Sequence, residues 1–163
     1  MKEDNIEIER KFLVGKPSWK RLTKLNTYEI FQFYTVITDD TCERYRLCNN
    51  KAFFAEKIGT GLTRKEIEYQ VPIEVARREL EKCKTIPIKK IRTEVSFKGY
   101  KWEIDTFLDD NAGLIIAEIE LVKEDEIIPI PSWVTLEVTG KPEYLNCNLA
   151  MNPYNKWIKN EQL

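Results

Sequence analysis

The sequence predicts a mainly β (α+β) protein in which about eight antiparallel strands close into a barrel, a tunnel with a charged lumen and a few flanking helices. Two sequence observations and one general argument support this fold class. Most of the 163 residues fall into short segments that alternate apolar and polar residues with a period of two. Gly, Pro, Asn and Asp separate these segments. Closure removes the exposed edges that an open sheet would leave. Without an internal repeat or a linker, residues 1–163 are expected to form a single domain.

The first half of the chain predicts a series of strands with one short helix. Strands are expected at 5–14, 28–38, 42–48, 52–58 and 64–71. Pro17 lies near the start of a short helix expected over 17–25. Asn49 and Asn50 separate two strands by two residues of a type that favours tight turns, which predicts a hairpin.

The second half adds the clearest helix and the remaining strands. The helix is expected over 73–84, with an apolar face made by Val75, Ala76, Leu80 and Cys83. Strands follow at 88–98, 101–108, 114–122 and 134–139, and the first two are joined across Gly99-Tyr100. The tail, 142–163, is expected to be partly helical with a break at Pro153. The helices are expected to cover the apolar outer face of the barrel.

Composition excludes several classes of protein. The chain has no histidine, which removes the Ser-His and Cys-His nucleophile systems and the usual zinc site. With 26 basic and 27 acidic residues the formal net charge is −1, which argues against a nucleic-acid partner. No apolar run is long enough for a membrane helix. Without CxxC spacing or a visible secretion signal, the four cysteines predict reduced thiols in the cytoplasm.

Charged side chains share one face of each predicted strand and are sorted by sign. Acidic pairs lie at 7/9, 66/68, 103/105 and 118/120, and basic pairs lie at 44/46 and 90/92. A solvated face is the ordinary explanation for any one strand. However, like charges on one face repel, so repeated pairs require counter-ions. If this face points inward, the lumen would hold a polyanion together with divalent cations bound by carboxylates.

These segments resemble the CYTH domain, or triphosphate tunnel metalloenzymes, over nearly the whole chain. The resemblance rests on Glu7-x-Glu9-x-Lys11, Arg44-x-Arg46, Lys57, Arg64-x-Glu66-x-Glu68, Lys90-x-Arg92, Trp102 to Phe107, Gly113 to Leu121, and Trp133 with Glu137. It implies that the triphosphate is bound by Lys11, Arg44, Arg46, Lys57, Lys90 and Arg92. It also implies that Mg²⁺ or Mn²⁺ is held by Glu7, Glu9, Glu118 and Glu120, with Glu68, Asp105 and Glu137 as additional or water-mediated ligands.

The resemblance implies a metal-dependent hydrolase that cleaves a phosphoanhydride bond of a triphosphate, either inorganic triphosphate or an organic triphosphate, and the sequence does not fix which is preferred. Lys90 or Glu7 is expected to orient the attacking water, and the sequence does not choose between them. One alternative is an adenylate cyclase of the same family, with Tyr34 or Tyr45 stacking on the base. Another is a polyphosphate-binding module without catalysis. The expected partner is a small-molecule triphosphate, with no nucleic acid or membrane, and a homodimer is left open.

Overall fold

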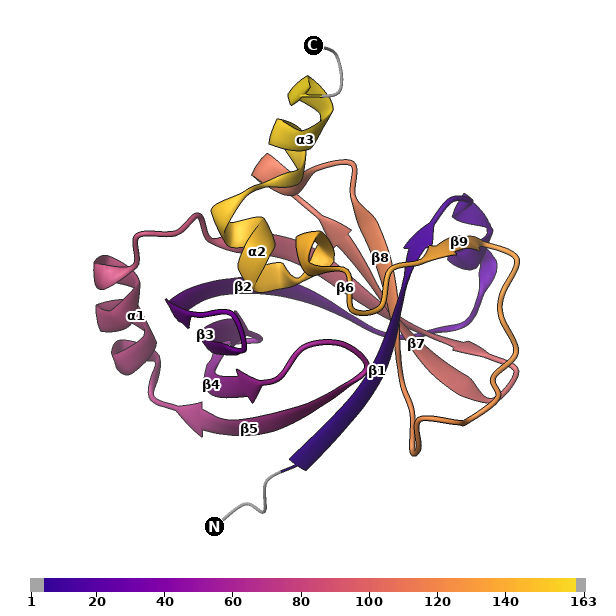
Figure 1. The fold of residues 1–163 in the computed structure, drawn as a ribbon, viewed down its shortest axis with the longest axis horizontal. Coiled ribbons are helices and arrows are strands. Elements are labelled where there is room, and N and C mark those ends of the chain that lie inside the picture. Colours follow the sequence, from indigo (N-terminus) through magenta and orange to yellow (C-terminus); the bar gives the residue numbers. More distant parts are fainter. Residues whose placement is uncertain (1–4, 161–163) are drawn as a thin grey trace.

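The computed structural model describes residues 5–160 and consists mainly of antiparallel strands (Figure 1). The strands are β1 (Asn5–Val14), β2 (Lys24–Ile37), β3 (Thr41–Cys48), β4 (Lys51–Ile58), β5 (Thr63–Val71), β6 (Ile88–Phe97), β7 (Tyr100–Phe107), β8 (Ile115–Glu120) and β9 (Val134–Glu137). The α-helices are α1 (Ile73–Lys82), α2 (Asn146–Met151) and α3 (Tyr154–Asn160). Short 3₁₀ helices are η1 (Pro17–Arg21), η2 (Asp109–Asn111) and η3 (Pro142–Tyr144).

The sheet closes on itself through β1. Its strand order is β5-β4-β3-β2-β6-β7-β8-β1-β9, and β5 also pairs with β1, so eight strands form a closed antiparallel barrel. Residues 5–8 of β1 pair with β5, whereas residues 9–13 pair with β8. The short strand β9 pairs with β1 at Phe12 and Val14 and lies beside it in Figure 1. The predicted eight-stranded barrel is therefore confirmed, with β9 as an added strand.

Element boundaries differ from the predictions in two places, whereas the tail agrees with its prediction. The segment expected as a helix over 17–25 forms only the 3₁₀ helix η1, and β2 already begins at Lys24 because Lys24 and Asn26 pair with β6. Tertiary pairing therefore overrides the local helical preference here. The turn between β6 and β7 is made by Lys98 and Gly99, both with positive φ. The tail forms two helices on either side of Pro153, and residues 161–163 lie outside the described part.

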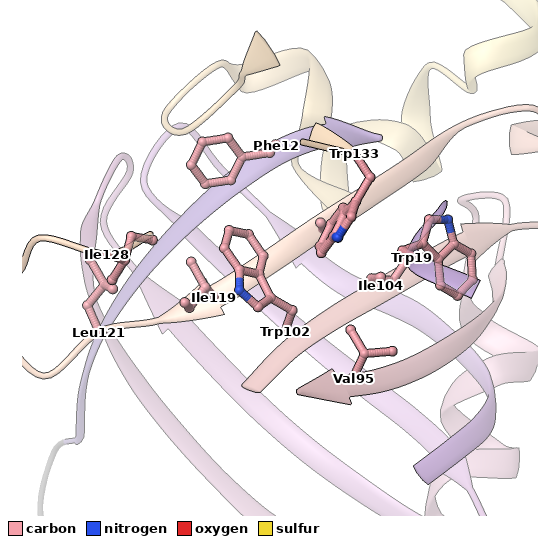
Figure 2. Close-up of a cluster of buried hydrophobic side chains, with 10 residues drawn as sticks. Phe12, Trp19, Val95, Trp102, Ile104, Ile119, Leu121, Ile128 and Trp133 are labelled. Atoms are coloured by element: carbon pink, nitrogen blue, oxygen red, sulfur yellow. The ribbon is translucent and has the colours of Figure 1, made fainter. Parts of the chain in front are cut away.

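The apolar face of β1, β6, β7 and β8 carries the larger core cluster, shown in Figure 2. At its centre the ring of Trp102 lies 5.6 Å from that of Phe12 and 5.4 Å from that of Trp133. Trp19 of η1 and Ile128 of the loop before β9 pack over this cluster (Figure 2). The expectation that helices cover the outer face is thus correct only in part. Helix α1 packs against β2, β3 and β4, while η1 and the loop before β9 cover the opposite side.

One end of the barrel interior is apolar and is closed by α2. Leu149 and Ala150 of α2 are buried against Tyr34, Ile88 and Phe107, whose positions in register place them on the same strand faces as the charged residues. In Figure 1, α2 packs against the barrel and α3 projects away from it. The lumen therefore has an apolar, covered end and a charged remainder. None of the helices in the described residues could span a membrane.

Candidate functional site

The charged part of the lumen is a cavity of about 500 Å³ to which all eight barrel strands contribute side chains. Alternation along each strand sends every second residue inward, so the charged positions of the sequence converge on one space. Leu145, Asn146 and Cys147, at the start of α2, also line the cavity. The predicted charged lumen is therefore present, and it is bounded by a helix that the charge pattern did not reveal.

Three guanidinium groups gather on one side of this cavity: those of Arg44 and Arg46 on β3 and that of Arg92 on β6. Arg46 Nε donates a hydrogen bond of 3.1 Å to the neutral side chain of Gln32. Burial, with the nearby charges of Arg44 and Arg92, lowers the pKa of Arg46 to about 10. Arg44 and Arg92 are paired with carboxylates, whereas no acidic side chain lies within ion-pair distance of Arg46 in the described residues, so an anion placed beside Arg46 would be favoured.

Lys90 lies beside these arginines and is almost fully buried. Its Nζ donates to Asp105 Oδ2 at 2.6 Å and to Asn146 Oδ1 at 3.0 Å. Burial lowers the pKa of Lys90 to about 8, although Asp105 acts in the opposite direction. Asp105 also accepts two hydrogen bonds from Arg92, at 2.7 and 2.8 Å. Lys90 is therefore held in place by two contacts, and burial weakens its hold on the third proton.

Carboxylates occupy the other side of the cavity and are partly unsatisfied. Burial, followed by the charge of Glu118, raises the pKa of Glu9. Glu9 Oε1 is buried and makes no hydrogen bond, and its two ion pairs are long, with Lys11 Nζ at 3.3 Å and Arg64 at 3.7 Å. Burial and the charges of Glu7 and Glu9 also raise the pKa of Glu120. These carboxylates lack sufficient positive charge, which is the condition under which a divalent cation binds.

The remaining lumen carboxylates are bridged by basic side chains. Both oxygens of Glu7 accept from Lys57 Nζ at 3.0 Å, and Oε2 also accepts from Arg64 at 3.0 Å. Lys11 Nζ lies 3.1 Å from Glu118 Oε1. Glu68 accepts from Arg44 at 2.7 Å, closer to the rim. Acidic and basic groups therefore neutralise each other across much of this lumen.

Most of the residues predicted for the site line this one cavity. They are Glu7, Glu9, Lys11, Arg44, Arg46, Lys57, Glu68, Lys90, Arg92, Glu118 and Glu120. Asp105 and Glu137 do not. Asp105 is completely buried behind the wall, between Lys90 and Arg92.

Glu137 lies on the outer surface of the barrel. It pairs with Arg10 through two contacts of 2.8 Å, because its position opposite Phe12 in the sheet directs its side chain away from the lumen. The expectation that Glu137 contributes to a lumen metal site is therefore wrong. The alternation within 134–139 could not reveal this, because β9 adds to the barrel rather than closing it.

Several cavity residues were missing from the predicted set. Arg64 and Glu66 share the face of Glu68, and Glu103 forms an ion pair with Arg92, so the alternation pattern contained a signal for all three. Asn146 lies in a tail with no strand periodicity and left no such signal. Tyr45, considered as a base-stacking residue, lies outside the lumen with its ring 5.4 Å from that of Phe33.

The donor set of the cavity fits a hard divalent cation. All of the candidate ligands are carboxylate oxygens, which suit Mg²⁺ or Mn²⁺. Within residues 5–160, no three acidic or thiol side chains already converge on one point as a metal cluster would. Lysine and arginine side chains instead lie between them. The orphaned oxygen of Glu9 and the raised pKa values of Glu9 and Glu120 indicate where a cation would be accepted.

Comparisons with known proteins agree with this geometry. No model of a known protein family matches the chain. The chain is 42% identical over 153 residues to the inorganic triphosphatase of Acetivibrio thermocellus, covering 93% of this chain and 97% of the relative. It is 32% identical over 154 residues to that of Nitrosomonas europaea, covering 90% and 97%. The solved structure of the inorganic triphosphatase NE1496 matches with a TM-score of 0.64 at 28% identity, over 89% of this chain and 94% of that one.

Proposed function

The chain belongs to the CYTH, or triphosphate tunnel metalloenzyme, family, and we propose that it is a divalent-metal-dependent hydrolase that cleaves a phosphoanhydride bond of inorganic triphosphate. The proposal rests on one arrangement. Arg44, Arg46 and Arg92 lie close together on one side of the cavity, and Glu9 Oε1, on the other side, is buried without a hydrogen bond. One wall of the cavity attracts an anion and the other attracts a cation. A triphosphate with a divalent metal satisfies both walls at once.

The basic side chains of the cavity bind the triphosphate. They are Lys11, Arg44, Arg46, Lys57, Lys90 and Arg92. Guanidinium groups match pairs of phosphate oxygens, and lysine ammonium groups add compact charges. Lumen carboxylates already hold several of these donors around the cavity before the substrate arrives, so the basic wall is in place to stabilise charge on the transferred and leaving oxygens.

The carboxylates hold Mg²⁺ or Mn²⁺. Glu7, Glu9, Glu118 and Glu120 are the principal ligands, and Glu68 acts from the rim. The metal supplies charge neutralisation for the phosphates and lowers the pKa of bound water. Asp105 is excluded from this set because it is completely buried and does not line the cavity.

Lys90 is preferred over Glu7 as the residue that orients the attacking water. Glu7 is one of the carboxylates proposed to hold the metal, so it is not free to orient the water as well. Lys90 combines a fixed position with a pKa lowered to about 8, so it can hold a water and exchange a proton with it near neutral pH. A cyclase would in addition need a platform for the base. Of the two candidates, Tyr45 lies outside the lumen. Tyr34 lines the cavity, but its ring is buried against α2 and its hydroxyl accepts a hydrogen bond from Gln32, so it offers little free surface to a base.

The test is phosphate release from inorganic triphosphate, ATP and thiamine triphosphate, each with Mg²⁺ and with Mn²⁺, and production of cyclic AMP from ATP. We expect turnover of inorganic triphosphate to exceed that of the other two, and to disappear when a chelator removes the metal. Glu9→Gln and Arg46→Ala should each lower kcat/KM by about 100-fold or more.

Two variants on the outer surface control for the change in charge. Arg10→Ala and Glu137→Gln remove an arginine and a glutamate that pair with each other outside the lumen, and both should retain activity. If the pure protein hydrolyses no triphosphate with either metal, or if the surface variants lose as much activity as the lumen variants, the proposal fails. Tight binding of triphosphate without turnover would instead favour a binding module.

Residues 1–163 are proposed to act as one domain, located in the cytoplasm. Cell fractionation measures the location. Size-exclusion chromatography distinguishes a monomer from a homodimer, which the sequence left open.

A further inference from the structure

We propose that Asn146, the first residue of α2, is a positioning residue that orients the ammonium group of Lys90 toward the substrate. This inference rests on the proposed function, because it assigns a role in the same cavity. Asn146 belongs to the tail of the chain rather than to the barrel, and it lines the covered end of the lumen.

The contacts of Lys90 leave one direction open. A lysine ammonium group has three N–H donors. One is directed to Asp105 Oδ2 at 2.6 Å and a second to Asn146 Oδ1 at 3.0 Å. Because Lys90 lines the cavity, the third donor is the one available to a ligand there. Asp105 alone would leave the group free to rotate about one hydrogen bond, and Asn146 removes that freedom.

The chemistry at this position requires a neutral acceptor. Asn146 Oδ1 accepts from Lys90 Nζ and also from Gln32 Nε2, at 3.3 Å. Both partners are donors, so an oxygen must face them. A carboxylate could accept the same two hydrogen bonds, but it would add a negative charge beside the binding site of a polyanion. The amide oxygen provides the acceptor without that repulsion.

The same network reaches the arginine wall. Gln32 is fully buried, and its Oε1 accepts from Arg46 Nε at 3.1 Å while its Nε2 donates to Tyr34 at 2.9 Å. Asn146 is held in place because Leu149 and Ala150, one turn further along α2, are buried in the apolar end of the barrel. The orientation of Lys90 therefore depends on the packing of α2, and not only on the strand that carries Lys90.

Two substitutions separate positioning from charge. Asn146→Ala removes the acceptor and should lower kcat by about tenfold or more, with KM changed less than about threefold, because misplacing a catalytic group affects the transition state most. Asn146→Asp keeps an acceptor at the same place and should retain kcat within about fivefold, whereas repulsion of the triphosphate should raise KM by about tenfold.

Asn148→Ala is the matched control on the same helix. Asn148 Nδ2 donates to the backbone oxygen of Pro142 at 2.7 Å, so this change loosens α2 without removing a contact to Lys90. Its kcat should stay within about twofold of the wild-type value. If Asn148→Ala loses as much kcat as Asn146→Ala, or if Asn146→Ala keeps full kcat, the positioning role is overturned.

A measurement independent of activity distinguishes this inference from the proposed function. Nuclear magnetic resonance of ¹⁵N-labelled lysine side chains, with Lys90→Arg to assign the signal, reports exchange of the ammonium protons with water. The Lys90 signal should exchange slowly in the wild type and in Asn146→Asp, and faster in Asn146→Ala. Unchanged exchange in Asn146→Ala would disprove the contact. A wild-type protein that shows this pattern but hydrolyses no triphosphate would disprove only the proposed function.

Discussion

Asp105 shows how burial decides what a carboxylate does. It is completely buried and accepts hydrogen bonds from Lys90 at 2.6 Å and from Arg92 at 2.7 and 2.8 Å. Its neighbours on β7 and β8, Glu103 and Glu118, face the open cavity. All three are acidic residues on inward faces, but only the last two have access to a ligand. Asp105 instead fixes the positions of two cations.

Asp105→Asn should therefore be strongly destabilising. It leaves Lys90 and Arg92 buried with less compensating charge, and breaking such a pair costs roughly 3–5 kcal/mol in the free energy of unfolding. Denaturant-induced unfolding at pH 7 measures the loss. Glu137→Gln, which removes a carboxylate from a pair on the surface, should cost less than about 1 kcal/mol.

The pH dependence of this loss has a definite sign. Burial alone would raise the pKa of Asp105, but Arg92 and Lys90 hold it below the usual value of 3.8. The carboxylate therefore stabilises the fold fully above that value, and its contribution declines as the pH falls toward the lower pKa of the folded state. The difference in stability between the wild type and Asp105→Asn should narrow below about pH 4. A constant difference down to pH 3 would contradict this account.

At the scale of elements, short-range sequence signals were most reliable where a turn has strict backbone requirements. Asn49 and Asn50 join β3 to β4 with φ values of 51° and 58°. Both central residues of this type of hairpin turn must adopt the left-handed conformation, which Asn tolerates better than most residues. The prediction of a hairpin at this position followed from the same requirement.

Asn50→Ala should weaken this hairpin. The side chain of Asn50 is exposed, so the substitution mainly introduces backbone strain, and we expect a loss of about 1 kcal/mol in the free energy of unfolding. Asn50→Gly is the matched control, because glycine adopts this conformation without strain and should leave stability equal or slightly higher. Thermal and denaturant unfolding compare the three proteins. Equal losses in both variants would show that a side-chain contact, and not φ, is responsible.

At the scale of the whole molecule, the barrel keeps a charged interior where an ordinary core would be apolar. Its apolar packing lies outside the strands, around Trp102 and Trp133, and at the end that α2 covers. The charged lumen therefore provides groups that bind a ligand, but burying those charges lowers the free energy of unfolding of the ligand-free protein. Arg46 illustrates this, because burial and its arginine neighbours lower its pKa to about 10.

Arg46→Gln should stabilise the ligand-free protein while it impairs triphosphate binding. It removes a disfavoured charge but keeps a donor for Gln32, so we expect the free energy of unfolding to rise by on the order of 1 kcal/mol. Calorimetry without phosphate or metal measures this change. Arg10→Gln, which removes an arginine paired with Glu137 on the surface, should bring no gain. A fall in stability for Arg46→Gln would show that the arginine wall is already compensated within the protein.

The sequence by itself determined the barrel and most of the site, because strand alternation depends only on neighbouring residues. Once every second residue points inward, pairs such as Glu7 with Glu9 and Arg44 with Arg46 must line one lumen. Tertiary structure alone decided what lies between and beyond the strands. The register of β9 directs the side chain of Glu137 outward. Asp105 is completely buried and does not reach the cavity, and the packing of α2 places Asn146 within hydrogen-bond distance of Lys90. These outcomes depend on contacts between residues far apart in the chain, which no local pattern encodes.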